Sequence, residues 1–183
     1  MKFERLAIPD VILATPPRFA DSRGYFFEAY NVPRFKAGGI DVDFIQDNQS
    51  RSKKGVVRGL HCQIAPNVQG KLVRCLHGAI WDVAVDIRRG SPTYGQHVSA
   101  ILSAENGAQL WVPGGFLHGF MALEDDTDVM YKVNAPYDKG AERGVMWNDP
   151  DLALPWPETT TPIVSDKDQE LPLLRDCDAW YTL

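Results

Sequence analysis

Hydrophobic and polar residues alternate with a period of two along much of the chain. The clearest run covers residues 81–87, where every odd position is hydrophobic and two of the three even positions are aspartates. Such alternation is typical of β-strands, whose successive side chains point to opposite faces. We therefore predict a protein built mainly from strands.

Short runs of the same kind recur between turn signals such as Asn106-Gly107. They lie at residues 11–14, 25–29, 56–63, 71–76, 97–102, 109–112, 119–123, 129–133 and 145–147. One short helix is predicted over Pro33–Ala37, ending at two glycines. About ten short, closely spaced strands are typical of an all-β barrel or jelly-roll sandwich. No glycine-rich phosphate loop follows a strand, which disfavours a dinucleotide-binding or P-loop fold.

Composition narrows the class of protein. We expect the 183 residues, 1–183, to form a single domain with a substantial core. The three cysteines are widely spaced, which fits a reducing cytoplasm better than a disulfide framework. We expect no signal peptide, because the N-terminus lacks a continuous apolar stretch. We expect no membrane span, because the longest uncharged run contains a proline, four glycines and a histidine. The net charge of -5 excludes a basic nucleic-acid coat and, taken alone, suggests a neutral or cationic partner.

His61 lies in a strand-like run close to two basic residues. Lys71 begins the next predicted strand, and Arg58 precedes His61 by three residues. Strict alternation would turn Arg58 away from His61, whereas a β-bulge at Gly59 would turn it towards His61. Cations and an imidazole that converge inside a barrel are costly without an anionic ligand. The cluster therefore indicates an anion-binding site.

His118 ends a Pro-x-Gly-x-x-His pattern over residues 113–118. This pattern resembles the second motif of cupin barrels, which places a histidine in the barrel mouth. The first cupin motif is incomplete, because Gln63 replaces its second histidine and its glutamate is missing. Two imidazoles without a carboxylate fall short of the three or four ligands that a divalent metal needs. We therefore expect an all-β, cupin-type jelly-roll barrel with a few short helices and no metal.

The candidate residues suit proton transfer without a metal. The imidazole of His61 can act as a general base near neutral pH, and Lys71 can stabilise an oxyanion. Tyr131 can donate or accept a proton, although by itself it is more typical of an amphipathic strand residue whose hydroxyl bonds to the backbone. Base, cation and phenol suit removal of a proton next to a carbonyl through an enolate, which is isomerase chemistry that needs no cofactor. Cys62 follows His61 but points to the opposite face, so we expect an unreactive buried thiol.

A series of short motifs along nearly the whole chain matches one known family. They are Asp21–Phe26 with Glu28, Gln46–Asn48, Gly55–His61, Gln69–Arg74, Asp82–Arg88, Gly90–Thr93, Leu102–Asn106, Pro113–His118, Tyr131-Lys132, Glu142–Gly144, Trp147–Pro150 and Ser165–Asp168. The chain resembles the dTDP-4-dehydrorhamnose 3,5-epimerase family. The resemblance implies conversion of dTDP-4-dehydro-6-deoxy-D-glucose to dTDP-4-dehydro-L-rhamnose, by proton exchange at C3 and C5, in dTDP-L-rhamnose biosynthesis.

The resemblance also implies residue roles. His61 corresponds to the base, and Asp168 to the carboxylate that orients it. Lys71 corresponds to the residue that faces the C4 oxygen, and Tyr131 to the acid on the opposite face of the sugar ring. The positions that bind the nucleotide sugar in the family correspond to Arg23, Glu28, Gln46, Asp47, Asn48, Arg58, Lys71, His118, Glu142 and Lys167.

The family's assembly bears on the partner of this chain. Family members are homodimers that exchange N-terminal strands, so we expect a homodimer in which Arg23 and Glu28 reach the neighbouring subunit's site. Basic residues around a pyrophosphate would reverse the inference from net charge, with Arg23, Arg58, Lys71 and Lys167 in the mouth of the barrel and the acidic excess elsewhere. We expect no nucleic-acid or membrane partner.

Three alternatives stay open. Pro136-Tyr137 stands where the family often has a Tyr-Tyr pair that helps shape the sugar pocket, so an enzyme acting at only C3 or C5 is one alternative. A metal-dependent cupin is the second, opposed by Gln63. A non-catalytic sugar-binding barrel is the third, opposed by the proton-transfer residues.

Overall fold

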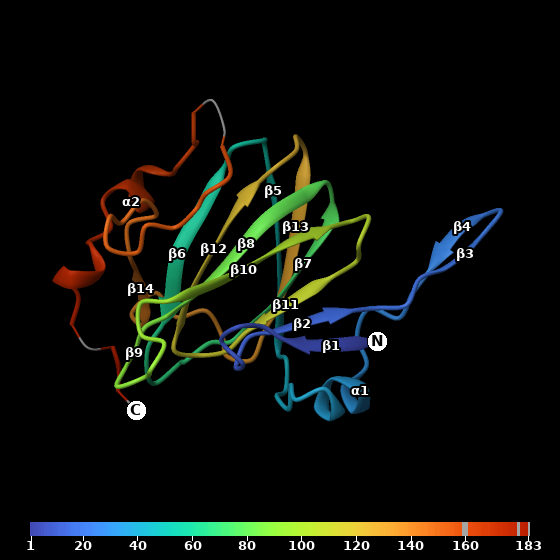
Figure 1. Cartoon of the computed structure of the whole chain (residues 1–183), viewed down its shortest axis with the longest axis horizontal. Coiled ribbons are helices and arrows are strands. Elements are labelled where there is room, and N and C mark those ends of the chain that lie inside the picture. The colour runs from blue at the N-terminus through green and yellow to red at the C-terminus, as the bar shows by residue number, and fades with distance from the viewer. Residues whose placement is uncertain (159–160, 179, 183) are drawn as a thin grey trace.

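Two antiparallel sheets make up most of the molecule (Figure 1). The computed structural model describes residues 1–158, 161–178 and 180–182. The six-stranded sheet has the order β1 (Lys2–Arg5), β2 (Ile12–Thr15), β11 (Gln109–Val112), β7 (Lys71–His77), β13 (Thr127–Val133) and β5 (Gln46–Ser52). The five-stranded sheet has the order β10 (His97–Ser103), β8 (Ala79–Asp86), β12 (Phe116–Ala122), β6 (Val57–Gln63) and β14 (Glu142–Gly144). The all-β, jelly-roll prediction is confirmed, with two separate sheets in place of one closed barrel.

The remaining elements are small. Strands β3 (Phe19–Asp21) and β4 (Gly24–Phe26) form a hairpin that projects away from the two sheets (Figure 1). Strand β9 (Arg88–Arg89) pairs in parallel with β15 (Tyr181–Thr182) near the C-terminus. The helices are α1 (Val32–Ala37), α2 (Asp166–Gln169) and a 3-10 turn, η1 (Leu174–Asp176). The predicted helix at residues 33–37 is therefore confirmed as α1, which Asn31 caps by accepting the backbone N–H of Arg34.

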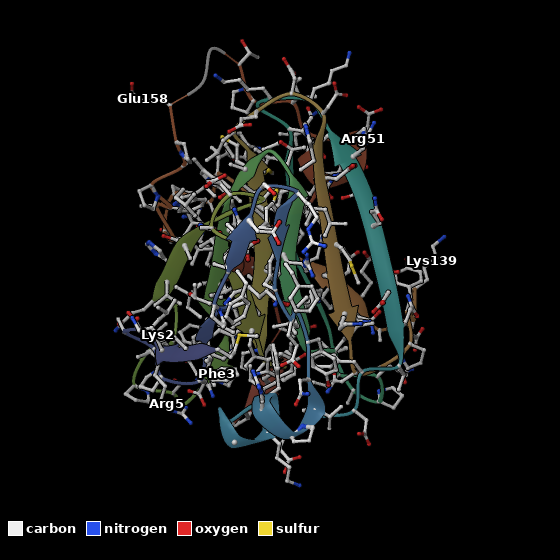
Figure 2. All side chains as sticks on the ribbon, turned by 90° about the vertical axis from the view of Figure 1, so that its right-hand side faces the viewer. Lys2, Phe3, Arg5, Arg51, Lys139 and Glu158 are labelled. Carbon is white, nitrogen blue, oxygen red and sulfur yellow. The ribbon has the colours of Figure 1, made fainter. Side chains whose placement is uncertain are left out.

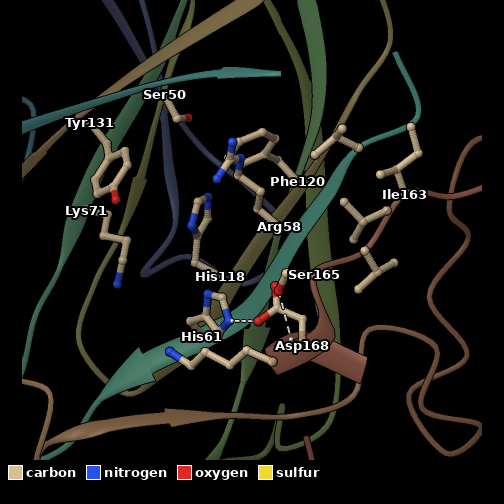
Figure 3. A pocket seen from close by; sticks show the side chains of 14 residues that line it. Ser50, Arg58, His61, Lys71, His118, Phe120, Tyr131, Ile163, Ser165 and Asp168 are labelled. Carbon is tan, nitrogen blue, oxygen red and sulfur yellow. Dashed lines mark hydrogen bonds and ion pairs between the residues drawn. The ribbon is translucent and has the colours of Figure 1, made fainter. Parts of the chain in front are cut away.

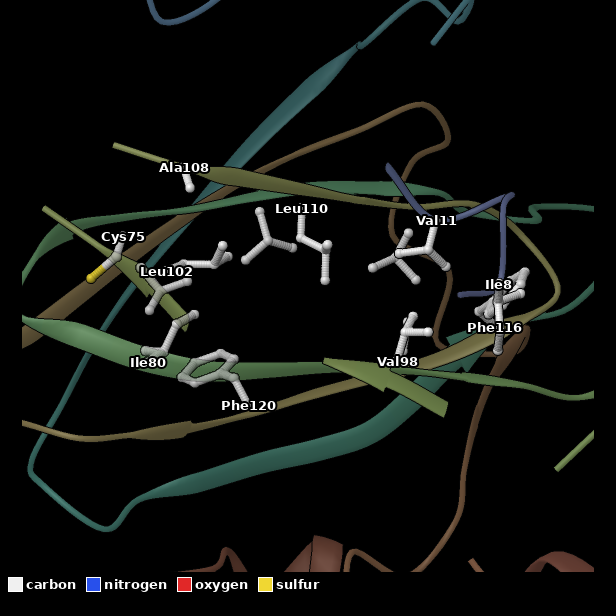
Figure 4. Packing of buried hydrophobic residues seen from close by; sticks show 14 residues of the cluster. Ile8, Val11, Cys75, Ile80, Val98, Leu102, Ala108, Leu110, Phe116 and Phe120 are labelled. Atoms are coloured by element: carbon white, nitrogen blue, oxygen red, sulfur yellow. The ribbon is translucent and has the colours of Figure 1, made fainter. Parts of the chain in front are cut away.

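The space between the sheets holds the main core (Figure 4). Residues of both sheets contribute to it, including Val73, Leu110, Val129, Ile80, Leu102 and Phe120. Charged side chains such as Lys139 project outward from the ribbon (Figure 2). Burial of these aliphatic and aromatic groups holds the sheets face to face, at about 25 cal/mol for each Å² removed from water.

Strand β8 is buried on both faces. Its odd positions, beginning with Trp81, pack against the C-terminal segment in a second core that includes Leu152 and Trp156. Its even positions point between the sheets, where Ala84 joins the main core and both aspartates, Asp82 and Asp86, are buried. The predicted alternation is confirmed, but the polar face is the interior one.

Several strands were missed, and two of the predicted runs are wrong in whole or in part. Strand β5 was not expected, because its sequence Gln-Asp-Asn-Gln-Ser-Arg-Ser lacks hydrophobic residues; its alternating burial comes from a half-covered position at the sheet edge. The run expected at 25–29 ends at Phe26, where the chain leaves the hairpin. Residues 145–147 form no strand, since the pairing with β6 involves Glu142–Gly144.

Candidate active site

A cavity of about 520 Å³ lies between the two sheets and the segment that carries α2 (Figure 3). The five-stranded sheet supplies Val57, Arg58, His61, His118 and Phe120. The facing sheet supplies Ser50, Lys71 and Tyr131. The remaining lining residues are Val56 and, from the α2 segment, Ile163, Val164, Ser165, Lys167 and Asp168. Seven of the residues singled out from the sequence therefore meet here: Arg58, His61, Lys71, His118, Tyr131, Lys167 and Asp168.

A β-bulge brings Arg58 and His61 to the same cavity. His61 pairs with His118 and Arg58 with Phe120, so β6 contains one more residue than β12 between these pairs. The bulge allowed for at Gly59 is therefore present. Gly59 has φ +126°, and a Cβ there would lie 2.7 Å from the Cα of Gly119. Only glycine fits this close approach of two strands.

His61 and Asp168 form a hydrogen-bonded pair, although 107 residues separate them. His61 Nε2 lies 2.7 Å from Asp168 Oδ1, and the backbone N–H of Gly59 donates to Asp168 Oδ2 at 3.4 Å. The hydroxyl of Ser165 caps α2 by accepting the N–H of Asp168, which fixes the carboxylate under the ring. Burial raises the pKa of Asp168, but hydrogen bonding and attraction from His61 outweigh it, and the pKa lies below its ordinary value. Asp168 is therefore ionised and orients His61.

Lys71 and Tyr131 face this pair from the opposite sheet (Figure 3). Lys71 makes no ion pair within the described residues, and burial lowers its pKa to about 8 against weaker opposing effects of Cys62 and Glu142. Burial also raises the pKa of Tyr131, an effect that Arg58 partly opposes. At neutral pH the cavity thus holds an ammonium and a protonated phenol.

His118 has a carboxylate partner of its own. Its Nε2 lies 2.7 Å from Oδ1 of Asp82, which is fully buried on β8. Asp82 was placed only on the polar face of a strand by the sequence pattern, with no signal for a site. Its connection to His118 depends on the pairing of β8 with β12, which distant parts of the chain provide.

The edge of the site holds a cluster around Glu142. Its Oε2 accepts hydrogen bonds from Lys167 Nζ at 2.6 Å and from the Tyr137 hydroxyl at 3.0 Å. Burial raises the pKa of Glu142, and the hydrogen bonds from Lys167 and Tyr137 more than reverse this effect. Glu142 thus holds Lys167 beside the cavity.

Strand β5 carries three residues expected to bind the nucleotide sugar, Gln46, Asp47 and Asn48, and they do not all lie on the same face. Asn48 pairs with Tyr131 and shares a face with Gln46 and with Ser50, which lines the cavity. Gln46 donates to the side chain of Asn48 at 2.8 Å. Asp47 points to the other face and pairs with Lys132 at 3.0 Å.

Arg23 and Glu28 lie outside the cavity. Arg23 is at the exposed tip of the β3–β4 hairpin, where it pairs with Asp21 at 2.6 Å. Glu28 lies 3.2 Å from Arg34. Among the described residues, the lysines and arginines that line the cavity are therefore Arg58, Lys71 and Lys167.

Several contributors to the site were missed by sequence reasoning. Ser50, Phe120 and Ile163 line the cavity as ordinary strand and loop residues, so no motif marks them. Ile163 reaches it because its backbone bonds to Gly55 and Val57 at the start of β6. Such a contact between distant segments leaves no periodic signal in the sequence.

Gln63 is engaged in structural contacts. Its amide nitrogen donates to the carbonyls of Asn67 and Pro136, and its oxygen accepts the N–H of Asp138. Across the described ranges, no three histidine, cysteine or acidic side chains gather as a group that could hold a metal ion. In the same ranges the structure contains no helix with the length and apolar character that a membrane crossing requires. Cys62 is buried in the second core, which raises its thiol pKa to about 12, in line with an unreactive thiol.

Known proteins share both the sequence and this fold. A family model described as dTDP-4-dehydrorhamnose 3,5-epimerase matches residues 5–176. The enzyme of that name from Sinorhizobium fredii is 54% identical over 175 residues, covering 95% of this chain and 90% of the relative. A dTDP-6-deoxy-D-glucose-3,5-epimerase from Legionella pneumophila, solved with dTDP-4-keto-L-rhamnose, is 42% identical with a TM-score of 0.95, covering 100% of this chain and 98% of the other.

A more distant neighbour has a narrower activity. It is a 3'-monoepimerase from Streptomyces bikiniensis in complex with dTDP-quinovose, 32% identical with a TM-score of 0.88, covering 93% of this chain and 86% of the other. The family match and the greater similarity to the double epimerases identify the class of enzyme. The chain belongs to the dTDP-4-dehydrorhamnose 3,5-epimerase family and is an isomerase of that class.

Proposed function

We propose that this epimerase exchanges the C3 and C5 protons of dTDP-4-dehydro-6-deoxy-D-glucose between His61 and Tyr131, giving dTDP-4-dehydro-L-rhamnose. One observation carries the proposal: the imidazole and the phenol come from opposite sheets and face one cavity (Figure 3). Inversion at a carbon requires that a proton leave one face of the ring and arrive on the other. Two groups on opposed walls satisfy this requirement.

His61 is proposed as the base. Asp168 is ionised and accepts the Nε2 hydrogen, so the lone pair of the neutral ring lies on Nδ1. Nδ1 has no hydrogen-bond partner in the described part of the chain and is free to take a proton from carbon. The carboxylate then stabilises the imidazolium that forms.

Lys71 is proposed to stabilise the enolate. Removal of either proton places negative charge on the C4 oxygen, and an ammonium partly withdrawn from water interacts strongly with such charge. The described residues offer Lys71 no ion-pair partner that would compete with the oxyanion. Its attraction therefore grows as the enolate forms, which lowers the barrier.

Tyr131 is proposed as the acid. The raised pKa keeps its hydroxyl protonated at neutral pH, ready to donate to the enolate carbon. In this proposal, His61, Tyr131, Lys71 and Asp168 carry the reaction, and it needs no metal or cofactor.

The nucleotide is proposed to bind at the mouth of the cavity. Arg58 and Lys167 suit the pyrophosphate, and Gln46, Asn48 and Glu142 offer polar groups nearby. His118 is proposed to bind the sugar. We further propose a cytoplasmic homodimer of single-domain subunits, in which the exposed β3–β4 hairpin carries Arg23, with Glu28 beyond it, to the neighbouring site. Asp47, on the opposite face of β5, would contribute through its ion pair with Lys132.

Solvent exchange tests the proposal. In D₂O, NMR of the keto-sugar nucleotide is expected to show deuterium at both C3 and C5. His61→Gln is expected to slow exchange by about 10² or more while dTDP binding persists, because the base supplies the chemistry. His77→Gln, at an exposed histidine outside the cavity, is the matched control. Unchanged exchange in His61→Gln would exclude His61 as the base.

The mono-epimerase alternative has support from the shared fold of the Streptomyces neighbour. Deuterium at only one carbon in the same experiment would favour it. Activity that disappears with a chelator and returns with a divalent metal would favour the metal-dependent alternative.

A further inference from the structure

Asp82 is a buried carboxylate with one partner. Its side chain is fully inaccessible to water, and its paired neighbours on the flanking strands are Ala100 and Phe120. Oδ1 contacts His118 Nε2 at 2.7 Å, whereas Oδ2 has no hydrogen-bond partner among the described residues. An unsatisfied charged oxygen in such surroundings is costly and calls for an explanation.

Asp86 shows what a structural aspartate on the same strand face looks like. Its oxygens accept hydrogen bonds from Arg88, Ser91 and Thr93, all in the turn that follows β8. Every contact of Asp86 thus serves the local fold. Asp82 makes no such set of contacts and touches a cavity residue instead.

The two histidine–carboxylate pairs of the cavity differ in their carboxylates. Asp168 receives donors on both oxygens, from His61 and from Gly59, which favours the ionised form. Asp82 has a donor on one oxygen only, and burial raises its pKa. A net negative charge on the buried Asp82–His118 pair is therefore disfavoured, which favours a neutral pair that holds one more proton than a carboxylate with a neutral imidazole.

Wherever that proton lies on the pair, His118 presents the same group to the cavity. If it lies on His118, both ring nitrogens carry hydrogen; if it lies on Asp82, the carboxyl donates to Nε2 and the ring hydrogen is on Nδ1. In both forms Nδ1 bears a hydrogen. Nδ1 has no partner within the described ranges, and His118 lines the cavity.

We propose that Asp82 is a positioning residue that makes His118 Nδ1 a fixed hydrogen-bond donor to an oxygen of the sugar. This inference rests on the proposed function. It gives the paired histidines of β6 and β12 opposite roles, with His61 accepting a proton from carbon and His118 donating a hydrogen bond. The donor can serve either the ring hydroxyl beside the reacting carbon or the enolate oxygen, both of which are acceptors.

NMR of the ring nitrogens tests the assignment without turnover. With ¹⁵N-histidine labelling, the His118 signals, identified by their loss in His118→Gln, are expected to show hydrogen on Nδ1 at pH 7. In Asp82→Leu, His118 is expected to populate both neutral tautomers, so that Nδ1 carries hydrogen only part of the time. A wild-type His118 with an unprotonated Nδ1 would overturn the proposal.

Kinetics supply the second readout. Asp82→Leu is expected to lower kcat/KM at least 10-fold. Its dTDP affinity is expected to be unchanged, and its unfolding midpoint to be unchanged or raised. Asp82→Asn, whose amide can donate to Nε2, is expected to keep the Nδ1 hydrogen and to recover much of the loss. In a His118→Gln background, Asp82→Leu is expected to have no further effect on kcat/KM. Wild-type kcat/KM in Asp82→Leu, or equal effects in the two backgrounds, would contradict the proposal.

Asp86→Asn is the matched control for a structural aspartate. It is expected to lower the unfolding midpoint and leave kcat/KM unchanged at temperatures where it is folded. Asp82→Leu showing this same pattern would reduce Asp82 to a structural role. If Asp82→Leu does not fold, Asp82→Asn decides: wild-type kcat/KM together with loss of the Nδ1 hydrogen would overturn the proposal. Absence of deuterium exchange in the wild type would instead contradict the proposed function, while the ring-nitrogen measurement would still test Asp82.

Discussion

Lys71 is a half-buried ammonium without an ion-pair partner among the described residues, and we predict that its replacement by methionine separates stability from activity. Burial lowers its pKa from 10.5 to about 8, which corresponds to about 3 kcal/mol at about 1.4 kcal/mol for each pH unit. Methionine fills a similar volume without charge. At pH 7 we therefore expect Lys71→Met to unfold less readily, by up to about 3 kcal/mol.

The pH dependence gives this prediction a sign. Above pH 8 the folded wild type loses the lysine proton, whereas the unfolded chain keeps it up to 10.5. The unfolded state then binds more protons, so wild-type stability rises with pH across this window. The advantage of Lys71→Met is expected to be full below pH 8 and to shrink towards pH 10.5.

Urea denaturation at pH 7 and pH 10 measures both quantities, and exchange at C3 and C5 measures activity. Loss of the ammonium is expected to slow exchange by about 10² or more. Lys139→Met, at an exposed lysine, is the control and is expected to change stability by less than about 0.5 kcal/mol (Figure 2). A destabilised Lys71→Met, or a gain that is equal at both pH values, would refute the reasoning.

Three further substitutions follow from the geometry. Gly59→Ala is expected to cost about 2 kcal/mol or more and to abolish exchange, because the new Cβ would lie 2.7 Å from Gly119 in a backbone region that alanine avoids; thermal denaturation checks this, and wild-type stability would contradict it. Asp168→Asn is expected to slow exchange about 10²-fold or more with dTDP affinity kept, and equal loss of both would indicate a collapsed site instead. Asp86→Asn is expected to lose about 2 kcal/mol at neutral pH, since hydrogen bonds from Arg88 and its turn outweigh burial and lower the pKa of Asp86 from 3.8 to about 2. That loss should disappear as the pH falls from 3.8 to about 2, because wild-type Asp86 is then protonated, and a loss constant with pH in acid denaturation would contradict this account.

The sequence determined those features that depend on local pattern. Period-two alternation predicted most strands, because successive Cβ atoms of a strand point to opposite sides whatever lies around them. Gly38 and Gly39 marked the end of α1 because glycine readily adopts the backbone conformations with which helices end, which is equally a local property. The residue types needed for proton transfer, with His61 and Tyr131 foremost, were also visible in the sequence. The polar strand β5 was missed, because its position at a half-covered sheet edge leaves no hydrophobic pattern.

Tertiary structure decided which of these residues meet. His61 reaches Asp168 across 107 residues, and the bulge at Gly59 turns Arg58 into the cavity because β6 must pair with β12. The polar face of β8 became the interior one, since the C-terminal segment covers the other face with hydrophobic side chains. Alternation fixes that two faces differ, but what packs against each face determines which is buried. That packing alone placed Asp82 beside His118.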